Sequence, residues 1–312
     1  MPLRFTLRQL EYLVAVGDAG SIAAAAQKIN VSSPSISTAI AQLEAEFGLP
    51  LFLRRHAHGL SLTQGGRQFV AEARAVLAAA GRLPDAAQAI TGQVRGPLAL
   101  GCLLTFAQVV LPQLRRGFSA VHAEVAITQT EHDQAAIFEG LRDASLDLAL
   151  TYDLQIPADL EFQALISLNP YVLLPPDHAL AGRARLKPQD LVGYPMVLLD
   201  LPYSADYFLS FFAREGLTPT IAERTRDLGV MRSMVANGFG YSIANLQPVN
   251  GAAPDGQALI YVPLESAVGP VQMGLVMARG AQVSLTIRAF TDHCRGMITA
   301  QGAPGVWGGQ TV

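Results

Sequence analysis

Side chains that could perform acid–base, nucleophilic or metal chemistry are scattered along this chain of 312 residues. The serines, histidines and carboxylates never adopt the spacing of a nucleophile elbow, a P-loop or an HExxH zinc motif. Gly238 and Gly240 follow an expected helix, which is the wrong context for a dinucleotide fingerprint. We therefore expect a protein that is not an enzyme and that has no catalytic residues and no cofactor.

The usual zinc ligands, cysteine and histidine, also lack a recognisable pattern. Cys102 and Cys294 lie far apart without CxxC spacing, so neither a disulfide framework nor a zinc site is expected. We interpret both as small buried apolar residues, with a redox-sensor role as the alternative. His56 and His58 have no cysteine or carboxylate nearby, which favours a solvated loop tip over a metal site.

Hydrogen-bonding side chains of a different kind gather between residues 21 and 44. Ser21 is expected to cap a short Ala-rich helix that Asn30 ends, and Ser32 begins a second helix with a proline in its first turn. The apolar residues of the second helix point inward, which leaves small hydroxyl side chains on its open face. Two helices joined by a tight turn form a helix-turn-helix, whose open face fits a DNA major groove. The residues expected to contact DNA there are Ser32, Ser33, Pro34, Ser35, Ser37, Thr38 and Gln42.

A first helix and a wing are expected on either side of this motif. Residues 6–17 carry an apolar stripe that can pack under the two helices, and LFLRRHAHGLSLT reads as two short strands around residues 56–59. Arg54 and Arg55 lie where such a wing meets the phosphate backbone, and arginine there supplies salt-dependent affinity. Residues 1–96 hold nine Lys and Arg against six Asp and Glu, whereas the remainder holds thirteen against nineteen. Only the first part suits a polyanion.

The frame of residues 7–65 resembles the amino-terminal domain of LysR-type transcriptional regulators, and the spacing is held without gaps. In this family Gln and Arg often stand where the chain has Ser33 and Thr38, and the loss of a long Arg removes a guanine or phosphate contact. The resemblance implies a homotetramer with one contact through linker helices and another between regulatory domains. The matching positions are Leu7, Leu10, Ser21, Ala25, Ala26, Val31, Ser32, Pro34, Ser37, Ile40, Leu43, Glu44, Gly48, Leu51, Phe52, Arg54, Leu62 and Thr63.

Residues 63–93 are expected to form a long linker helix. A helix at this place in LysR-type regulators pairs with its twin from a second subunit, so the resemblance implies a homodimer through the linker. Pro84 is expected to kink or interrupt the helix. The alternative is a helix packed on the core of its own chain. The apolar positions that repeat at three and four residues are Phe69, Ala73, Val76, Leu77 and Ala80.

From Gly96 onward strands and helices alternate, which is the βαβ signature of a parallel sheet. The fold class is therefore mixed: an all-α winged helix-turn-helix domain, a long linker helix and a two-lobed α/β domain. The resemblance implies that the last is a type 2 periplasmic-binding-protein-like effector domain. In the first lobe we expect strands at 98–102, 125–129 and 146–150 and a helix over 106–118. The expected domains are 1–62 (winged helix-turn-helix), 63–93 (linker helix), 94–300 (regulatory domain, lobe 1 at 94–166 and 264–300, lobe 2 at 167–263) and 301–312 (flexible tail).

Open α/β sheets bind small molecules beyond the carboxyl ends of their strands, where helix N-termini present free N–H groups. Thr105 and Ser204 are hydroxyls at such helix entries, which suits an anionic group, although ordinary helix caps would look the same. Arg226 and Asp227 either reach this cleft or a lobe interface, or simply begin a helix. The residues expected to contact an effector are Leu104, Thr105, Phe106, Thr130, Tyr152, Pro202, Tyr203, Ser204, Tyr207 and Asn245.

These features predict a cytoplasmic transcription regulator that binds double-stranded DNA at a palindromic promoter site and responds to a small-molecule effector, an organic or aromatic acid. The sequence contains neither a membrane-length apolar stretch nor the pattern of a signal peptide, so no membrane partner is expected. The alternative is a small-molecule solute-binding module whose amino-terminal helices only dimerise it.

Overall fold

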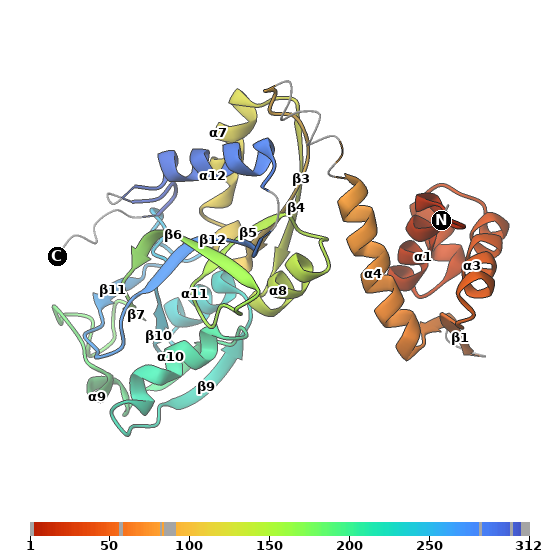
Figure 1. Cartoon of the computed structure of the whole chain (residues 1–312). Coiled ribbons are helices and arrows are strands. Elements are labelled where there is room, and N and C mark those ends of the chain that lie inside the picture. Colours follow the sequence, from red (N-terminus) through yellow and green to blue (C-terminus); the bar gives the residue numbers. More distant parts are fainter. Residues whose placement is uncertain are drawn as a thin grey trace. The chain divides into compact units, whose positions relative to one another are not determined.

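The computed structural model describes residues 3–55, 59–81, 83, 92–280, 283–299 and 302–306, and only the backbone of residues 54, 55 and 59 (Figure 1). The chain divides into a smaller unit, Met1–Ile90 with Asp143–Ser145, and a larger unit, Thr91–Arg142 with Leu146–Val312. The predicted mixed fold class is confirmed: helices dominate the smaller unit, and the larger unit is built from two α/β lobes.

The helices of the smaller unit begin at the residues whose side chains can cap them. Thr6 and Gln9 form a reciprocal capping box at the start of the first helix, Ser21 caps the second, and Ser32 caps the third with Pro34 in its first turn. Each of these hydroxyls accepts a hydrogen bond from a backbone N–H that the helix leaves without a partner. The elements are α1 (Leu7–Ala19), α2 (Ile22–Lys28), α3 (Ser33–Phe47), β1 (Phe52–Arg55), β2 (Gly59–Leu62) and α4 (Gln64–Gly81).

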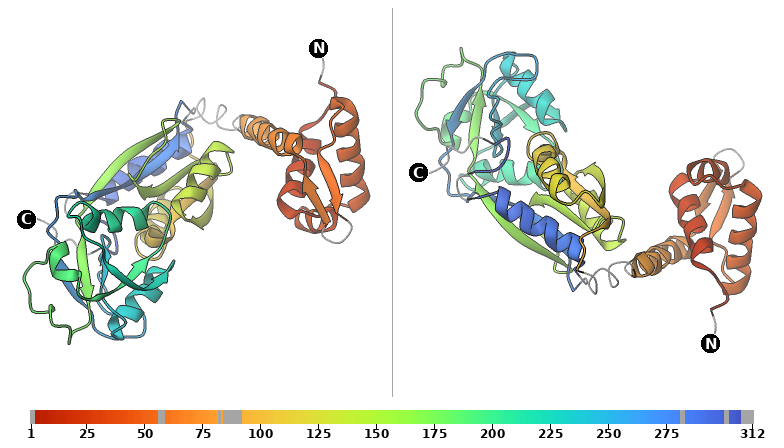
Figure 2. Two further views of the ribbon diagram at one scale, coloured as in Figure 1. Left: turned by 90° about the horizontal axis from the view of Figure 1, so that it is seen from below. Right: turned by 90° about the horizontal axis from the view of Figure 1, so that it is seen from above.

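Two small apolar clusters hold this unit together. Leu10, Leu13 and Val70 belong to one, which joins α1, α3 and α4, and Val16, Ala25 and Ile36 to the other, which joins α1, α2 and α3. Figure 2 shows α4 beside α1 in both views. The predicted wing is confirmed, because β1 and β2 pair antiparallel. The predicted kink at Pro84 and the loop tip at His56 and His58 fall outside the described residues.

Each lobe of the larger unit has its own sheet and its own core. The first sheet has the strand order β4-β3-β5-β12-β6. The second contains β10-β7-β11 and the pair β8-β9, which a bridge between Met196 and Tyr241 joins. The strands are β3 (Gly96–Leu103), β4 (Val125–His132), β5 (Leu148–Tyr152), β6 (Leu160–Leu168), β7 (Tyr171–Leu174), β8 (Pro195–Leu199), β9 (Thr220–Thr225), β10 (Ser242–Ala244), β11 (Ile260–Pro263) and β12 (Val271–Ala278).

The helices of the larger unit cover these sheets and connect their strands. In Figure 1, α12 lies beside α7 on the first lobe, and the His293 ring of α12 contacts the Leu114 carbonyl of α7 at 3.0 Å. The helices are α6 (Leu104–Ala107), α7 (Leu111–Val121), α8 (Gln134–Arg142), α9 (Pro188–Leu191), α10 (Ser204–Ala213), α11 (Leu228–Ala236) and α12 (Leu285–Met297).

The predicted parallel pairing is confirmed for β3, β4 and β5 of the first lobe, but neither lobe has a sheet that is parallel throughout. β3 pairs parallel with β4 and β5, but β12 returns from the second lobe and pairs antiparallel with β5 and β6. The predicted helix over 106–118 is two helices, α6 and α7, separated by a short turn. Strand β6 was not predicted, because it is an edge strand whose pattern of buried and exposed residues does not alternate cleanly.

Two short segments carry the chain between the lobes. The first, residues 169–170, joins β6 to β7, and the second, residues 264–270, joins β11 to β12. β6 continues to Leu168, so the first crossover starts slightly beyond the predicted position at Ile166. We call these two segments the crossovers.

Candidate DNA interface and effector site

Two of the hydroxyl side chains at the start of α3 form hydrogen bonds within its first turn. The Ser32 hydroxyl accepts from the Ser35 backbone N–H at 3.3 Å, and the two serine hydroxyls lie 2.7 Å apart. Ser33 is half-buried, whereas Pro34 is exposed. Ser32 and Ser35 therefore have local structural roles as well as a place on the open face.

The middle of α3 presents its polar residues away from the core. Ile36 and Leu43 are buried beneath it, while Ser37 and Thr38 are exposed on the opposite side. Exposed hydroxyls on a helix that other helices support can donate and accept hydrogen bonds at base edges or phosphates. The structure therefore leaves Ser37 and Thr38 accessible on the side of α3 that faces away from the core.

Gln42 has a neighbour that the sequence did not indicate. Its amide oxygen accepts a hydrogen bond from the amide nitrogen of Gln9 in α1, at 2.7 Å. Both residues are polar positions on separate helices, so only the packing of α1 against α3 reveals the pair. The contact orients the Gln42 side chain along the helix surface.

Glu44 positions the start of the wing. One carboxylate oxygen accepts from the backbone N–H groups of Leu51 at 2.7 Å and Phe52 at 3.3 Å. At the other end of the wing, the Leu60 N–H donates to the Gly20 carbonyl at 2.9 Å. These bonds tie β1 and β2 to the helices, and so fix where the backbone carries Arg54 and Arg55; the side chains of both arginines lie outside the described atoms.

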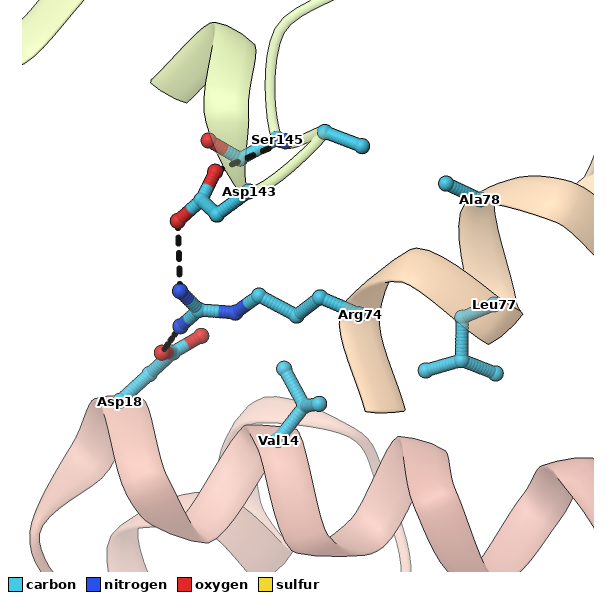
Figure 3. Close-up of a pocket in the computed structure, with 8 residues that line it drawn as sticks. Val14, Asp18, Arg74, Leu77, Ala78, Asp143 and Ser145 are labelled. Carbon is cyan, nitrogen blue, oxygen red and sulfur yellow. Dashed lines mark hydrogen bonds and ion pairs between the residues drawn. The ribbon is translucent and has the colours of Figure 1, made fainter. Parts of the chain in front are cut away.

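An ion pair holds helix α4 against α1, and close backbone packing holds its start against the preceding turn. Arg74 of α4 forms an ion pair with Asp18 of α1, and Figure 3 shows the two side chains meeting. Gly66 allows the approach of α4 to the preceding turn, because a Cβ there would lie 2.1 Å from the Leu51 carbonyl oxygen. Val76 and Leu83, seven residues apart, remain 41% and 71% exposed.

In the first lobe, two of the predicted effector contacts, Phe106 and Tyr152, pack against each other in the core. Both rings are buried and pack edge to face with their centroids 4.6 Å apart. Burial raises the pKa of Tyr152 well above its usual value, so its hydroxyl is neutral. Thr105 at the start of α6 is also buried, and Leu104 packs against the core of the second lobe.

Two positions of the predicted set lie within strands instead of beyond them. β4 continues to His132, so Thr130 pairs beside Gly101 and its hydroxyl lies 2.9 Å from the His132 ring. β5 continues to Tyr152. Thr130 is thus part of an edge strand, and its role as an effector contact stays a prediction. Both strands are longer than predicted. Their last residues include polar side chains, so the change from apolar to polar residues marks the end of the strand poorly.

The entry to α10 brings the second lobe against the first. Tyr203 precedes the helix with φ 65°, a left-handed conformation that costs a residue with a side chain about 1–3 kcal/mol. Its ring lies 5.6 Å from that of Phe138 in α8. Ser204 follows, only 2% exposed, and its hydroxyl has no hydrogen-bond partner among the described residues. Pro202 is half-buried beside them.

Asn245 and Tyr207 meet at the junction of the lobes. The Asn245 amide nitrogen donates to the Leu168 carbonyl at 3.0 Å and to the Tyr207 hydroxyl at 3.3 Å. The Tyr207 hydroxyl in turn donates to the Gly269 carbonyl at 3.1 Å. Burial raises the pKa of Tyr207 to about 12, so it keeps its proton at neutral pH. The Asn245 side-chain oxygen has no partner among the described residues.

Two buried polar residues outside the predicted set accompany these. The Gln134 amide nitrogen donates to the Tyr152 and Leu154 carbonyls, which anchors the end of β5, while its oxygen has no partner among the described residues. The Thr151 hydroxyl is likewise buried without a described partner. A buried polar atom without a partner is costly, and a ligand or water that pairs with it recovers the loss. A glutamine at a helix start gives no signal of this in sequence.

Polar bridges cross between the lobes. Arg226 pairs with Asp133 at 2.6 Å, and the Gln108 amide donates to Asp227 at 3.3 Å. Asp227 also caps α11, accepting from the Val230 N–H at 2.9 Å. Both alternatives for these residues are therefore met, because the helix start and the lobe interface coincide.

Within the part of the chain that the structure describes, no helix is long and apolar enough to cross a membrane. The same residues contain no group of three or more His, Cys, Asp or Glu that could hold a metal ion.

Comparison with known protein families matches two models. The model described as "LysR substrate binding domain" matches residues 91–298. The model described as "Bacterial regulatory helix-turn-helix protein, lysR family" matches residues 7–67.

Similar proteins of known name agree with these matches. The chain is 30% identical over 288 residues to the transcriptional activator protein LysR of Escherichia coli, covering 92% of this chain and 91% of that protein. The crystal structure of HinK, a LysR family transcriptional regulator from Pseudomonas aeruginosa, is 34% identical with a TM-score of 0.64, covering 95% and 99%. Full-length CbnR in complex with its target DNA is 25% identical with a TM-score of 0.66, covering 94% and 99%.

Proposed function

The chain belongs to the LysR family of DNA-binding transcriptional regulators, and from that premise we propose that it binds a palindromic promoter site as a homo-oligomer and answers to a small organic or aromatic acid. The observation that carries the DNA half is the capped α3 with Ser37 and Thr38 exposed on its open face. Two such units related by a two-fold axis read two half-sites separated by whole helical turns. The protein acts in the cytoplasm, where its DNA lies.

The proposed DNA contacts divide by their chemistry. Ser37 and Thr38 reach base edges, and the backbone positions of Arg54 and Arg55 on the wing suit phosphate contacts. Gln42 is oriented by Gln9 along the same helix. Because α3 lacks basic residues, sequence choice rests on short hydroxyls and on DNA shape. The other contacts proposed are Ser32, Ser33, Pro34 and Ser35.

The proposed oligomer is a tetramer built from two kinds of dimer contact. One contact uses α4, whose exposed Val76 lies seven residues before the exposed Leu83, the spacing of a two-helix seam. The other joins regulatory domains, as the family resemblance implies. The proposed domains are those expected from the sequence: 1–62, 63–93, 94–300 and the tail 301–312.

The proposed effector lies between the two lobes. Ser204 supports an acidic group there, because its buried hydroxyl at the start of α10 has no described partner. Asn245 supports a hydrogen-bond donor on the ligand, because its buried side-chain oxygen also has no described hydrogen-bond partner. The rings of Phe106 and Tyr152 suit an apolar or aromatic body. The remaining proposed contacts are Leu104, Thr105, Thr130, Pro202, Tyr203 and Tyr207.

The experiment is a nuclease footprint of the full-length protein on the DNA upstream of its own gene, with and without a panel of small carboxylic and aromatic acids. We expect a protected palindrome that shortens or shifts with one compound, because the effector must favour one arrangement of the regulatory domains. Absence of protection at low salt would refute the DNA half of the proposal.

A matched pair of variants tests the effector half. Ser204→Ala removes the buried hydroxyl without a partner and should abolish the footprint's response while basal protection stays. Ser210→Ala is the control on the same helix, because its hydroxyl donates to the Tyr207 carbonyl at 2.6 Å within α10. An unchanged response in Ser204→Ala would remove this residue from the site.

A further inference from the structure

The larger unit contains a cavity at the crossovers between its lobes. Its volume is about 840 Å³, within the range of about 300–1,000 Å³ typical of small-molecule sites. It lies along β11, an edge strand of the second lobe's sheet. None of the residues proposed above as effector contacts lines it. We call it the hinge pocket.

Both crossovers line the hinge pocket. Asn169 and Pro170 of the first and residues 264–270 of the second contribute to its wall. Since these are the segments through which the chain passes between the lobes, a molecule in the pocket would touch the places where backbone torsions change when the lobes rotate.

Two tyrosine rings give the pocket its aromatic character. Tyr171 and Tyr261 both line it, with ring centroids 5.2 Å apart and planes inclined by 52°. Their hydroxyls are already used: Tyr171 donates to the Leu246 carbonyl at 2.6 Å, and Tyr261 to the Gly251 carbonyl at 2.8 Å. Tyr171 is only 3% exposed, so the half-buried Tyr261 offers the ring surface to an occupant, and this favours a flat apolar body.

The rim of the pocket carries two charged side chains, Arg185 and Glu265. Arg185 lines the pocket and pairs with Glu265 at 2.9 Å through one of its nitrogens, while its side chain is 55% exposed. The guanidinium has five N–H donors, so several remain for a second acceptor. A single anionic or acceptor group on the ligand can meet these donors while the ring body lies on Tyr261.

We propose that the hinge pocket binds a flat aromatic small molecule that carries one anionic group, as a site separate from the interlobe cleft. Its ring body packs against Tyr261, and its anionic group meets Arg185. The site depends only on the residues around the crossovers and stands apart from the proposed effector contacts.

The pocket is also connected to the cleft by hydrogen bonds. The Gly269 carbonyl, in the second crossover, accepts from the Tyr207 hydroxyl, which accepts from Asn245. An occupant that fits one arrangement of the crossovers better than another stabilises that arrangement and so biases the lobe angle. Binding at the hinge pocket would thus modulate a response that begins in the cleft.

The test uses 1-anilinonaphthalene-8-sulfonate, a flat aromatic sulfonate whose fluorescence rises in apolar sites, with the full-length protein. Hydrogen exchange with and without the probe locates where it binds. We expect slower exchange in residues 259–270. Slowing confined to residues 103–107 and 201–207, or to α4, would overturn the proposal and assign the probe to the cleft or to the exposed helix face.

A matched pair of tryptophan variants then tests occupancy. Ala267 is an exposed residue of the pocket wall, and Ala258 is an exposed residue in the preceding loop outside it. Ala267→Trp should weaken the probe binding that slows exchange in residues 259–270 by about tenfold or more. Ala258→Trp should leave this affinity unchanged. Equal affinity in the two variants would overturn the proposal.

A third variant tests the contribution of the arginine charge separately from the space in the pocket. Arg185→Gln keeps a polar side chain at the rim but removes the charge, and it should weaken probe binding about threefold to tenfold. Unchanged affinity would remove the arginine from the site and with it the anionic part of the ligand class. Because the residue is exposed, the variant should fold normally, which thermal unfolding checks.

Discussion

At the scale of single residues, α3 separates the side chains that build it from those left for a partner. Ser32 and Ser35 share a hydrogen bond in the first turn, while Ser37 and Thr38 have no described hydrogen-bond partner. The helix therefore loses little when the second pair is changed. Any effect of those changes reports on DNA.

Ser37→Ala and Thr38→Ala are expected to weaken specific operator binding by about 1–3 kcal/mol for each lost base contact. Gel-shift titration at fixed salt measures this, and thermal unfolding should be unchanged because both side chains are exposed. Ser167→Ala, another exposed hydroxyl but in β6 of the larger unit, serves as the control. Equal affinities for all three variants and the parent would exclude the assignment.

The two cysteines show how burial decides reactivity. Cys102 and Cys294 are both fully buried in the core of the first lobe. Burial raises the pKa of the Cys294 thiol to about 12 and that of Cys102 well above its usual value. Because a raised pKa keeps a thiol protonated at all pH values below it, the nucleophilic thiolate is scarce near neutral pH.

We therefore expect neither thiol to react with 5,5′-dithiobis(2-nitrobenzoic acid) in the native protein between pH 7 and 9, and both to react after unfolding. Peroxide should likewise leave operator affinity unchanged. Rapid labelling of the native protein, or a peroxide-dependent gel shift that Cys294→Ala removes, would instead support the redox-sensor alternative.

At the scale of elements, α4 carries two faces with different tasks. One face packs on α1, where Val70 and Ala73 are buried and Arg74 meets Asp18. On another, Val76 stays exposed, as does Leu83 beyond the end of α4. An apolar stripe that continues beyond the core of its own unit is typical of a helix with a partner helix.

Val76→Glu is expected to shift the full-length protein toward smaller oligomers, because it places a charge in the proposed seam. Light scattering after size exclusion measures the mass. Ala71→Glu adds the same charge at an exposed position about 140° around the helix, and it should keep the parent mass. An unchanged mass in Val76→Glu would favour the alternative in which α4 serves only its own chain.

At the scale of the whole regulatory domain, contacts between the lobes determine how the two lobes are arranged relative to each other. Arg226 and Asp133 bridge the lobes with side chains 63% and 19% exposed, so the pair is worth about 0.2–1 kcal/mol. Tyr207 packs against the cores of both lobes, and Tyr203 packs against the core of the first. Weak ties of this size allow a ligand to change the balance between lobe arrangements.

Arg226→Gln is expected to speed hydrogen exchange at residues 103–107 and 201–207, because one tie between the lobes is lost. Arg224→Gln is the matched control: Arg224 pairs with Asp200 at 3.0 Å inside the second lobe and is similarly exposed. The same exchange rates in both variants would mean that the bridge does not hold the lobes together.

Much of the smaller unit could be predicted from local sequence, because its signals are local. Hydroxyls at Ser21 and Ser32 cap helices by bonding N–H groups three residues away, and the proline of α3 fits a first turn for the same short-range reason. The family resemblance of this stretch and the alternation of strands and helices after Gly96 then indicated the class of protein and its mixed fold.

Tertiary structure alone decided which distant residues meet. The insertion of β12 between β5 and β6, the bonds from Glu44 to the wing, and the union of both crossovers around one pocket all join segments far apart in the chain. Periodicity reports which face of an element is buried, but it does not report the element against which that face packs. Strand order, the polar atoms left without partners and the hinge pocket depend on that choice of neighbour.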